Sequence, residues 1–198
     1  MRQQIRLGIA HVGRALREPE DFADQWRTGE AHYSGWVWGS LLATAILGTT
    51  TYGMTMGLLC GPGAVFVKGI TCTFAAGIAW MLALPALYIL NSLGGSKLSI
   101  STTVLAALVT VSWGGLAMLA SIPINWFFTT AIPYPQIVLL VNLVVFSGVG
   151  VSMADVFRRV MQRLEPGRRG SYPVWWLCLV AALGTELFVH LGLFKFTT

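Results

Sequence analysis

The segment TVLAALVTVSWGGLAMLASIPINWF, residues 103–127, contains no ionisable side chain. A bilayer core about 30 Å thick needs roughly 20 apolar residues in an α-helix, so this segment is long enough to cross it. The pattern extends in both directions, because from Trp36 to Ala154 only Lys68 and Lys97 are charged. A stretch this long and apolar is not the core of a soluble domain. It predicts a protein that lies mostly within a lipid bilayer.

Composition agrees with the membrane class. Of the 198 residues 55% are hydrophobic and 11% are charged, whereas soluble domains carry about 25% charged residues. The net charge of +5 comes from arginines in two separate blocks rather than from one basic surface. We therefore expect no nucleic-acid partner. Three cysteines do not form a disulfide framework.

Apolar runs divide the chain into membrane spans. Each run is bounded by glycine, proline or short polar segments, such as Gly61-Pro62-Gly63 and Glu165-Pro166-Gly167. Backbone polar groups in lipid must bond within their own segment, so helices are expected. The predicted fold is all-α, a polytopic membrane protein with five transmembrane helices at 36–58, 70–90, 103–127, 137–157 and 174–194.

The basic residues predict the orientation. With five spans and the N-terminus inside, the inside segments carry eleven lysines and arginines and the outside segments carry two, Lys68 and Lys195. An excess of basic residues marks cytoplasmic loops. We therefore predict that the N-terminus is in and the C-terminus is out. The inside residues are Arg2, Arg6, Arg14, Arg17, Arg27, Lys97, Arg158, Arg159, Arg163, Arg168 and Arg169.

This topology gives the chain four parts. They are a cytoplasmic amphipathic segment (1–35), transmembrane helices one to four (36–157), a basic cytoplasmic loop (158–173), and the fifth helix with a short outer tail (174–198). In residues 2–17 apolar side chains recur at helical spacing, which predicts a helix on the membrane surface or a docking site for a soluble partner. Basic side chains expected at that surface are Arg2, Arg6, Arg14, Arg17, Arg158 and Arg159.

Span four is expected to continue into the cytoplasm as one helix. Asp155 lies three and four residues before Arg158 and Arg159, the spacing at which opposite charges pair on a helix.

Ionisable groups within a span are candidates for function because burying them in lipid is costly. The fifth span contains Glu186 and His190 one helical turn apart, and Asn142 in the fourth span lies at a comparable depth. We predict a polar cluster of these three residues. We favour a structural role, either a hydrogen-bonded contact between helices or a glutamate near the interface that reaches water. The alternative is a proton-linked or substrate-binding site.

Cysteines and small residues give further signals. Cys60 and Cys72 flank the first outside loop, so they either form a disulfide in an oxidising compartment or remain buried thiols. Glycine pairs at GxxxG spacing, such as Gly53 and Gly57, favour close helix packing. The sequence contains no CxxC, HExxH, Walker or GxSxG pattern. We therefore assign no catalytic residue, no metal site and no cofactor.

One segment resembles a known family. In LPALYILNSLGGSKLSISTTVLAALVTVSWGGLAMLASIPI, residues 84–124, an apolar helix, a Gly-Gly turn and a serine-rich return follow one another. This segment and the five-span topology resemble the Yip family of polytopic membrane proteins. The resemblance implies a five-helix membrane fold. Eukaryotic members are linked with Rab-type GTPases and membrane traffic, but residues 1–35 match no motif that transfers a binding residue.

Two classes of function follow. The first is a non-enzymatic membrane scaffold or accessory subunit, with the bilayer and other membrane or membrane-associated subunits as partners. The second is a small transporter or channel component that uses Glu186 and His190. The expected location is a bacterial inner membrane or an internal membrane.

Overall fold

The computed structural model describes residues 13–30, 33, 35–168 and 170–196, and these form helices joined by short loops. Within this part of the chain no strand occurs, which confirms the all-α class. Residues 13–17 are also helical. The elements are α2 (Pro19–Thr28), α3 (Gly35–Met56), the 3₁₀ turn η1 (Leu58–Cys60), α4 (Pro62–Leu93), α5 (Ile100–Ala131), α6 (Pro135–Leu164) and α7 (Trp176–His190).

Prolines and a serine cap account for several helix starts. Pro19, Pro62 and Pro135 begin α2, α4 and α6, where a missing N–H costs nothing because the first helical N–H groups have no partner within the helix. Ser99 caps α5, since its Oγ accepts a 3.2 Å hydrogen bond from the backbone N–H of Thr102. The helices therefore begin close to the predicted boundaries, except that α4 starts eight residues before the predicted second span at residue 70.

Three helices of the described chain, not the predicted five, are long and apolar enough to cross a membrane. They are α4 and α5, with 32 residues each, and α6, with 30 residues. At a rise of 1.5 Å per residue these helices are about 45–48 Å long, which exceeds the hydrocarbon core of about 30 Å. Their ends therefore extend into the headgroup regions.

The other two predicted spans fall short for different reasons. Helix α3 has 22 residues, but its threonines at positions 44, 49–51 and 55 lower its mean hydropathy. Helix α7 is apolar but has only 15 residues, a length of about 22 Å. It ends at His190, four residues before the predicted boundary.

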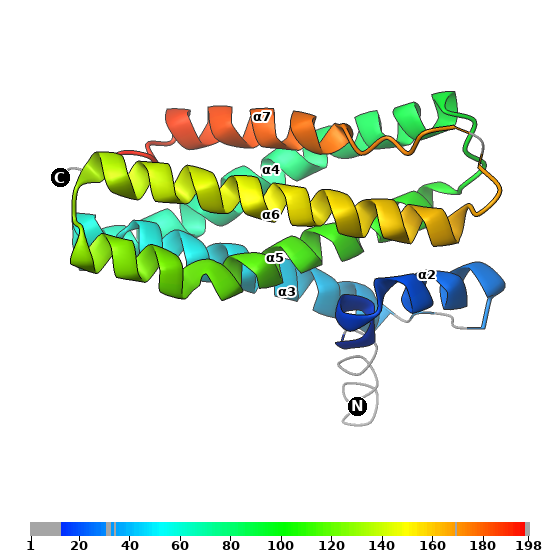
Figure 1. The fold of residues 1–198 in the computed structure, drawn as a ribbon, viewed down its shortest axis with the longest axis horizontal. Coiled ribbons are helices and arrows are strands. Elements are labelled where there is room, and N and C mark those ends of the chain that lie inside the picture. The colour runs from blue at the N-terminus through cyan, green and yellow to red at the C-terminus, as the bar shows by residue number, and fades with distance from the viewer. Residues whose placement is uncertain (1–12, 31–32, 34, 169, 197–198) are drawn as a thin grey trace.

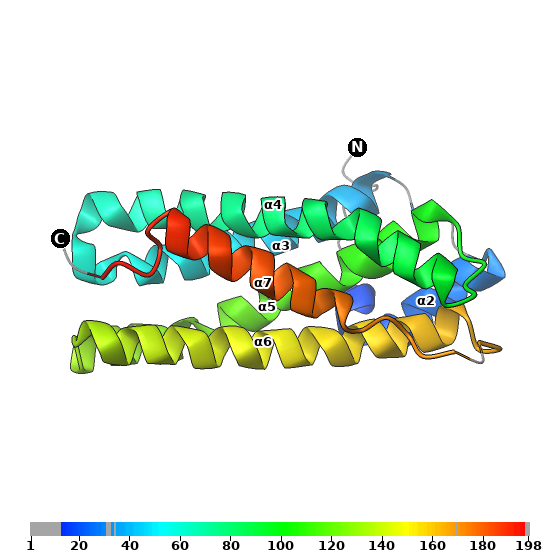
Figure 2. The same cartoon turned by 90° about the horizontal axis from the view of Figure 1, so that it is seen from above.

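Helices α3 to α7 run alternately up and down an elongated bundle (Figure 1). Helix α3 packs against both α4 and α5, and α5 packs against α6. Helix α7 lies against α4 and touches α6 only sparsely (Figure 2). The predicted continuation of span four is confirmed, because α6 extends to Leu164 and Arg159 Nε bonds to Asp155 Oδ2 at 2.9 Å.

The loops separate into two groups at opposite ends of the bundle. One end, here called the basic end, contains α2 and the loop residues 94–99, 165–168 and 170–175. The other, the opposite end, contains residues 57–61, 132–134 and 191–196. Helix α2 and these two loops, which the sequence assigns to the inside, therefore lie toward the same end of the bundle.

Helix α2 is part of the core and not only a surface segment. Its Phe22 is 1% exposed and belongs to a cluster with Phe157 and Val160 of α6. Two ion pairs surround this apolar contact, Glu20 with Arg159 at 2.9 Å and Asp24 with Arg163 at 3.3 Å. The docking of α2 thus combines apolar burial with charge complementarity to α6.

Tyr33 and Trp26 fix the chain on either side of this contact. The Tyr33 hydroxyl donates a 3.0 Å hydrogen bond to the Phe22 carbonyl, and the two rings stack with centroids 4.0 Å apart. Burial raises the pKa of the Tyr33 phenol to about 12, against a smaller opposite effect of Arg14. The phenol therefore stays protonated and continues to donate at neutral pH. Trp26 Nε1 donates to Thr102 Oγ1 of α5 at 3.1 Å.

We expect the apolar contact to dominate the docking of α2. Phe22→Ala should destabilise it by about 3 kcal/mol, because truncating a buried Phe costs about 3–5 kcal/mol. Glu20→Ala should cost less than about 1 kcal/mol, because Glu20 and Arg159 are partly exposed. Hydrogen exchange of the α2 amides measures the difference. If amide exchange in α2 were accelerated equally in both variants, the apolar contact would not dominate the docking of α2.

The helices come closest where glycines meet backbone. A Cβ added at Gly48 of α3 would lie 2.1 Å from the carbonyl oxygen of Gly115 in α5. A Cβ at Gly53 would lie 2.6 Å from the Cβ of Cys72 in α4. Helix α3 is therefore held between its neighbours at distances that only glycine permits.

Candidate functional site

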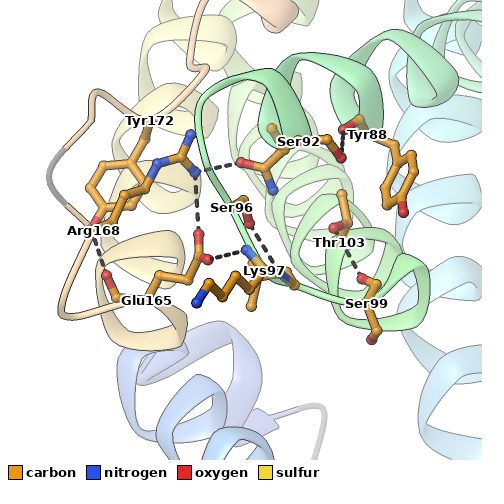
Figure 3. Close-up of polar contacts among 11 residues, drawn as sticks. Tyr88, Ser92, Ser96, Lys97, Ser99, Thr103, Glu165, Arg168 and Tyr172 are labelled. Carbon is orange, nitrogen blue, oxygen red and sulfur yellow. Dashed lines mark hydrogen bonds and ion pairs between the residues drawn. The ribbon is translucent and has the colours of Figure 1, made fainter.

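A buried arginine connects two loops at the basic end (Figure 3). The Arg168 side chain is 3% exposed, and its Nη1 bonds to Asn91 Oδ1 and to Glu165 Oε2, the latter at 3.2 Å. Its guanidinium lies 5.3 Å from the centre of the Tyr172 ring, and the Tyr172 hydroxyl donates to the Glu165 carbonyl at 3.2 Å. We call Asn91, Glu165, Arg168 and Tyr172 the arginine clamp.

The clamp depends on the turn between α4 and α5. Gly95 has φ +80°, a conformation that side chains disfavour. A Cβ on Gly94 would lie 2.3 Å from Arg168 Nη2, so a side chain there would displace the guanidinium. Glu165 Oε1 accepts a 2.9 Å bond from the backbone N–H of Lys97. The Gly-Gly turn therefore makes room for the arginine, and Glu165 fixes the chain after it.

The clamp has more donors than acceptors. Arg168 Nε and Nη2 and Asn91 Nδ2 are buried and have no hydrogen-bond partner. The free atoms are all N–H groups, so what fits them is an acceptor such as a carbonyl, a carboxylate or a phosphate. Among the described residues no group of three or more His, Cys, Asp or Glu side chains is placed to hold a metal ion.

The structure does not bring together the predicted cluster of Glu186, His190 and Asn142. Glu186 is 72% and His190 70% exposed, and they pair with each other at 3.3 Å on the outer face of α7. Asn142 is fully buried in α6. The prediction is wrong because α7 turns Phe188, not Glu186, toward the interior.

Asn142 belongs instead to a buried network across three helices. The Tyr52 hydroxyl of α3 donates to Asn142 Oδ1 at 2.9 Å, and Asn142 Nδ2 donates to Asn125 Oδ1 of α5 at 3.2 Å. Asn125 Nδ2 donates to Thr55 Oγ1 at 2.6 Å, and Thr55 Oγ1 donates to the Tyr52 carbonyl. The network therefore closes on itself. The signal that points to it is a second asparagine, Asn125, within an apolar span.

We expect Glu186→Gln to leave stability and any activity of the protein unchanged. The Glu186–His190 pair is exposed, and such pairs contribute about 0–1 kcal/mol. Thermal unfolding in mild detergent and a growth or assembly assay would measure this. A lost phenotype with intact stability would instead restore the candidate role of Glu186.

Cys60 and Cys72 are free thiols in the structure. Cys72 lies ten residues into α4, about 15 Å along the axis from its start, whereas bridged cysteines have Cα atoms about 4.4–6.8 Å apart. Cys72 packs against Gly53, and Cys60 faces the Lys195 carbonyl at 3.7 Å. The structure therefore shows two separate thiols, of which Cys72 is buried and Cys60 is half-buried.

Lys68 is not a loop residue, as the sequence suggested, but lies within α4 and is 8% exposed. Its Nζ donates to the carbonyls of Leu193, at 3.2 Å, and Lys195. It also lies 4.5 Å from the centre of the Phe196 ring. Lys68 thus fixes the tail after α7 to the start of α4.

The predicted surface arginines have different environments. Arg2 and Arg6 lie outside the described residues. Arg14, Arg17 and Arg158 are exposed, as expected at a membrane surface. Arg159 instead forms ion pairs with Glu20 and Asp155, so carboxylates of the protein itself compensate its charge.

An apolar groove of about 850 Å³ lies between α5 and α6. Gly148 is among its lining residues, and a Cβ added there would meet nothing within 4 Å. Exposed apolar side chains such as Ile124, Leu140 and Val144 border it. The groove therefore lies on the surface that would face lipid.

Comparisons with family models, curated proteins and solved structures find no match to this chain. The resemblance to the Yip family stays a prediction.

Proposed function

We propose that this chain is a non-enzymatic integral membrane protein that crosses the bilayer five times and acts as a scaffold or accessory subunit of a membrane complex. The N-terminus is in, the C-terminus is out, and the membrane is a bacterial inner membrane or an internal membrane. Two features support the five crossings. Helix α3 is about 33 Å long and runs beside the three long helices, and the described basic segments share one end.

The closed network of Tyr52, Thr55, Asn125 and Asn142 carries the functional proposal. Transport requires polar groups that face a route through the bundle, whereas these side chains bond to one another. Buried amides of this kind stabilise helix packing. A rigid bundle with an open groove between α5 and α6 fits a protein that packs against another membrane subunit.

The topology is tested by cysteine labelling in a background without native cysteines. Ser96→Cys at the basic end should react with a membrane-impermeant maleimide only after the membrane is opened. Tyr134→Cys, which replaces an exposed residue at the opposite end, should react in intact cells. Labelling of both from the same side would contradict five crossings.

The subunit role is tested by filling the groove. Gly148→Leu places a side chain where the protein itself has no atom within 4 Å, and Gly77→Leu does the same on α4 outside the groove. Native mass measurement in mild detergent should show a stoichiometric partner with the natural protein and with the Gly77 variant, and its loss with the Gly148 variant. A lone monomer in all three would overturn the proposal.

A further inference from the structure

Arg168 leaves one edge of its guanidinium free. Nη1 carries the bonds to Asn91 and Glu165, whereas Nε and Nη2 have no partner. In an arginine, the N–H groups of Nε and Nη2 point the same way and form the side of the fork that binds two oxygens at once. This edge is thus an unpaired bidentate donor, which is costly in a buried position. Because both of its atoms are buried, oxygens reach the edge only when the two loops separate.

Glycine backbone lies beside part of this edge. Gly94, from the α4–α5 loop, faces Nη2, and Gly170, from the α6–α7 loop, faces Nε. A Cβ at Gly170 would lie 3.1 Å from the Gly94 carbonyl oxygen and 3.9 Å from Arg168 Nε. Two glycines, one from each loop, therefore lie next to the unpaired edge.

Charge favours an anion at this junction. Glu165 is the carboxylate that pairs with Arg168, and it also accepts the backbone N–H of Lys97. The Lys97 side chain is exposed on the same loop. Asn91 contributes a further unpartnered N–H at Nδ2. The cluster therefore combines surplus donors with an excess of positive charge.

The depth of the clamp matches that of lipid phosphates. Helix α4 is about 48 Å long, so it extends about 9 Å beyond each side of a hydrocarbon core of about 30 Å if it is centred. Asn91 lies two residues before the end of α4, about 6 Å outside the hydrocarbon. That position is in the headgroup layer, about 5–8 Å thick.

We propose that the arginine clamp binds the phosphate group of an anionic lipid headgroup in the leaflet at the basic end. When the two loops separate, the two non-bridging phosphate oxygens accept from Nε and Nη2 of Arg168, and Asn91 Nδ2 is a further unpaired donor of the same clamp. The same chemistry suits a free phosphate, but the depth of the site favours a lipid. This site is independent of the scaffold role, because it lies away from the α5–α6 groove.

Lipid retention tests the proposal. The full chain is placed in nanodiscs of phosphatidylcholine with or without phosphatidylglycerol, released, and analysed by native mass spectrometry. The natural protein should retain phosphatidylglycerol about tenfold more tightly than Arg168→Lys, which keeps the charge but loses the bidentate edge. Arg163→Lys is the matched control, since Arg163 lies at the same end but pairs with Asp24 of α2. It should behave like the natural protein.

A second variant guards against a folding defect. Asn91→Asp retains an oxygen for Arg168 Nη1 and adds a carboxylate that repels an anion, so it should lose phosphatidylglycerol retention while unfolding no earlier than the natural protein in detergent. Equal retention by the natural protein, Arg168→Lys and Asn91→Asp would overturn the proposal.

Inorganic phosphate, added at millimolar concentration, distinguishes a lipid phosphate from a free phosphate as the bound group. If it stabilises the protein in phosphatidylcholine as much as phosphatidylglycerol does, the lipid assignment is overturned.

Discussion

Gly48→Ala is expected to destabilise the bundle by about 3 kcal/mol or more. The new Cβ would lie 2.1 Å from the carbonyl oxygen of Gly115 and 2.6 Å from its Cα. Overpacking a well-filled core costs about 1–3 kcal/mol when side chains can move. Here the obstacle is backbone, so α3 and α5 must separate and their remaining contacts weaken. Unfolding by heat or by a denaturing detergent, followed by circular dichroism, measures the loss.

Gly77→Ala is the matched control. Gly77 lies inside α4, and a Cβ there meets nothing within 4 Å. Because alanine is a better helix former than glycine by about 1 kcal/mol, this variant should be as stable as the natural protein or slightly more stable. Replacement of glycine by alanine should therefore lower the stability of the protein at position 48 and leave it unchanged or raise it at position 77. Similar effects at both would show that α3 and α5 are not in backbone contact.

Asn142→Ala is expected to cost about 2–4 kcal/mol. It removes the acceptor of the Tyr52 hydroxyl and the donor to Asn125 Oδ1, and each buried group left without a partner costs about 1–3 kcal/mol. Pairwise bonds between membrane helices are often worth less, about 0.6 kcal/mol on average, so the lower part of the range would reflect partners that rearrange. Reversible unfolding in detergent measures the change.

Ser147→Ala on the same helix provides the comparison. Ser147 is exposed, and its hydroxyl bonds to the Leu143 carbonyl of its own helix, so its removal should change stability by less than about 0.5 kcal/mol. Asn125→Ala combined with Asn142→Ala should cost less than the sum of the two, because the residues share one network. Strict additivity would show that the network does not act as a unit.

The helices were predictable because their signals are local. Apolar length, proline at the first turn and glycine in the loops are all read within a few residues. They place both ends of α5 and the start of α6 within a few residues of the observed positions. The early start of α4 was missed because Lys68 was assigned to a loop. Its partners, the carbonyls of Leu193 and Lys195, are 125 and 127 residues away.

The candidate site was less predictable because it depends on contacts between distant segments. Asn142 was correctly singled out as a polar group in a span, but the apolar pattern does not specify which helix it faces. Arg168 looked like one more basic residue at a membrane boundary, since nothing local connects it to Asn91, 77 residues earlier. The glycines at 94 and 95 were predicted to form a turn. That they also leave space for a guanidinium can be seen only in the folded structure.

The two attachments of the α7 region have a consequence for biogenesis. On the N-terminal side of α7, Arg168 bonds to Asn91 of α4. On its C-terminal side, the Leu193 carbonyl bonds to Lys68 of α4. Because α4 is synthesised about a hundred residues earlier, its α7-facing side meets lipid or another protein while α5 and α6 are inserted. Neither attachment can form before the residues on its side of α7 have been synthesised. Docking of α7 therefore follows the insertion of α4, and a chain truncated before residue 168 would leave this surface of α4 open to incorrect partners.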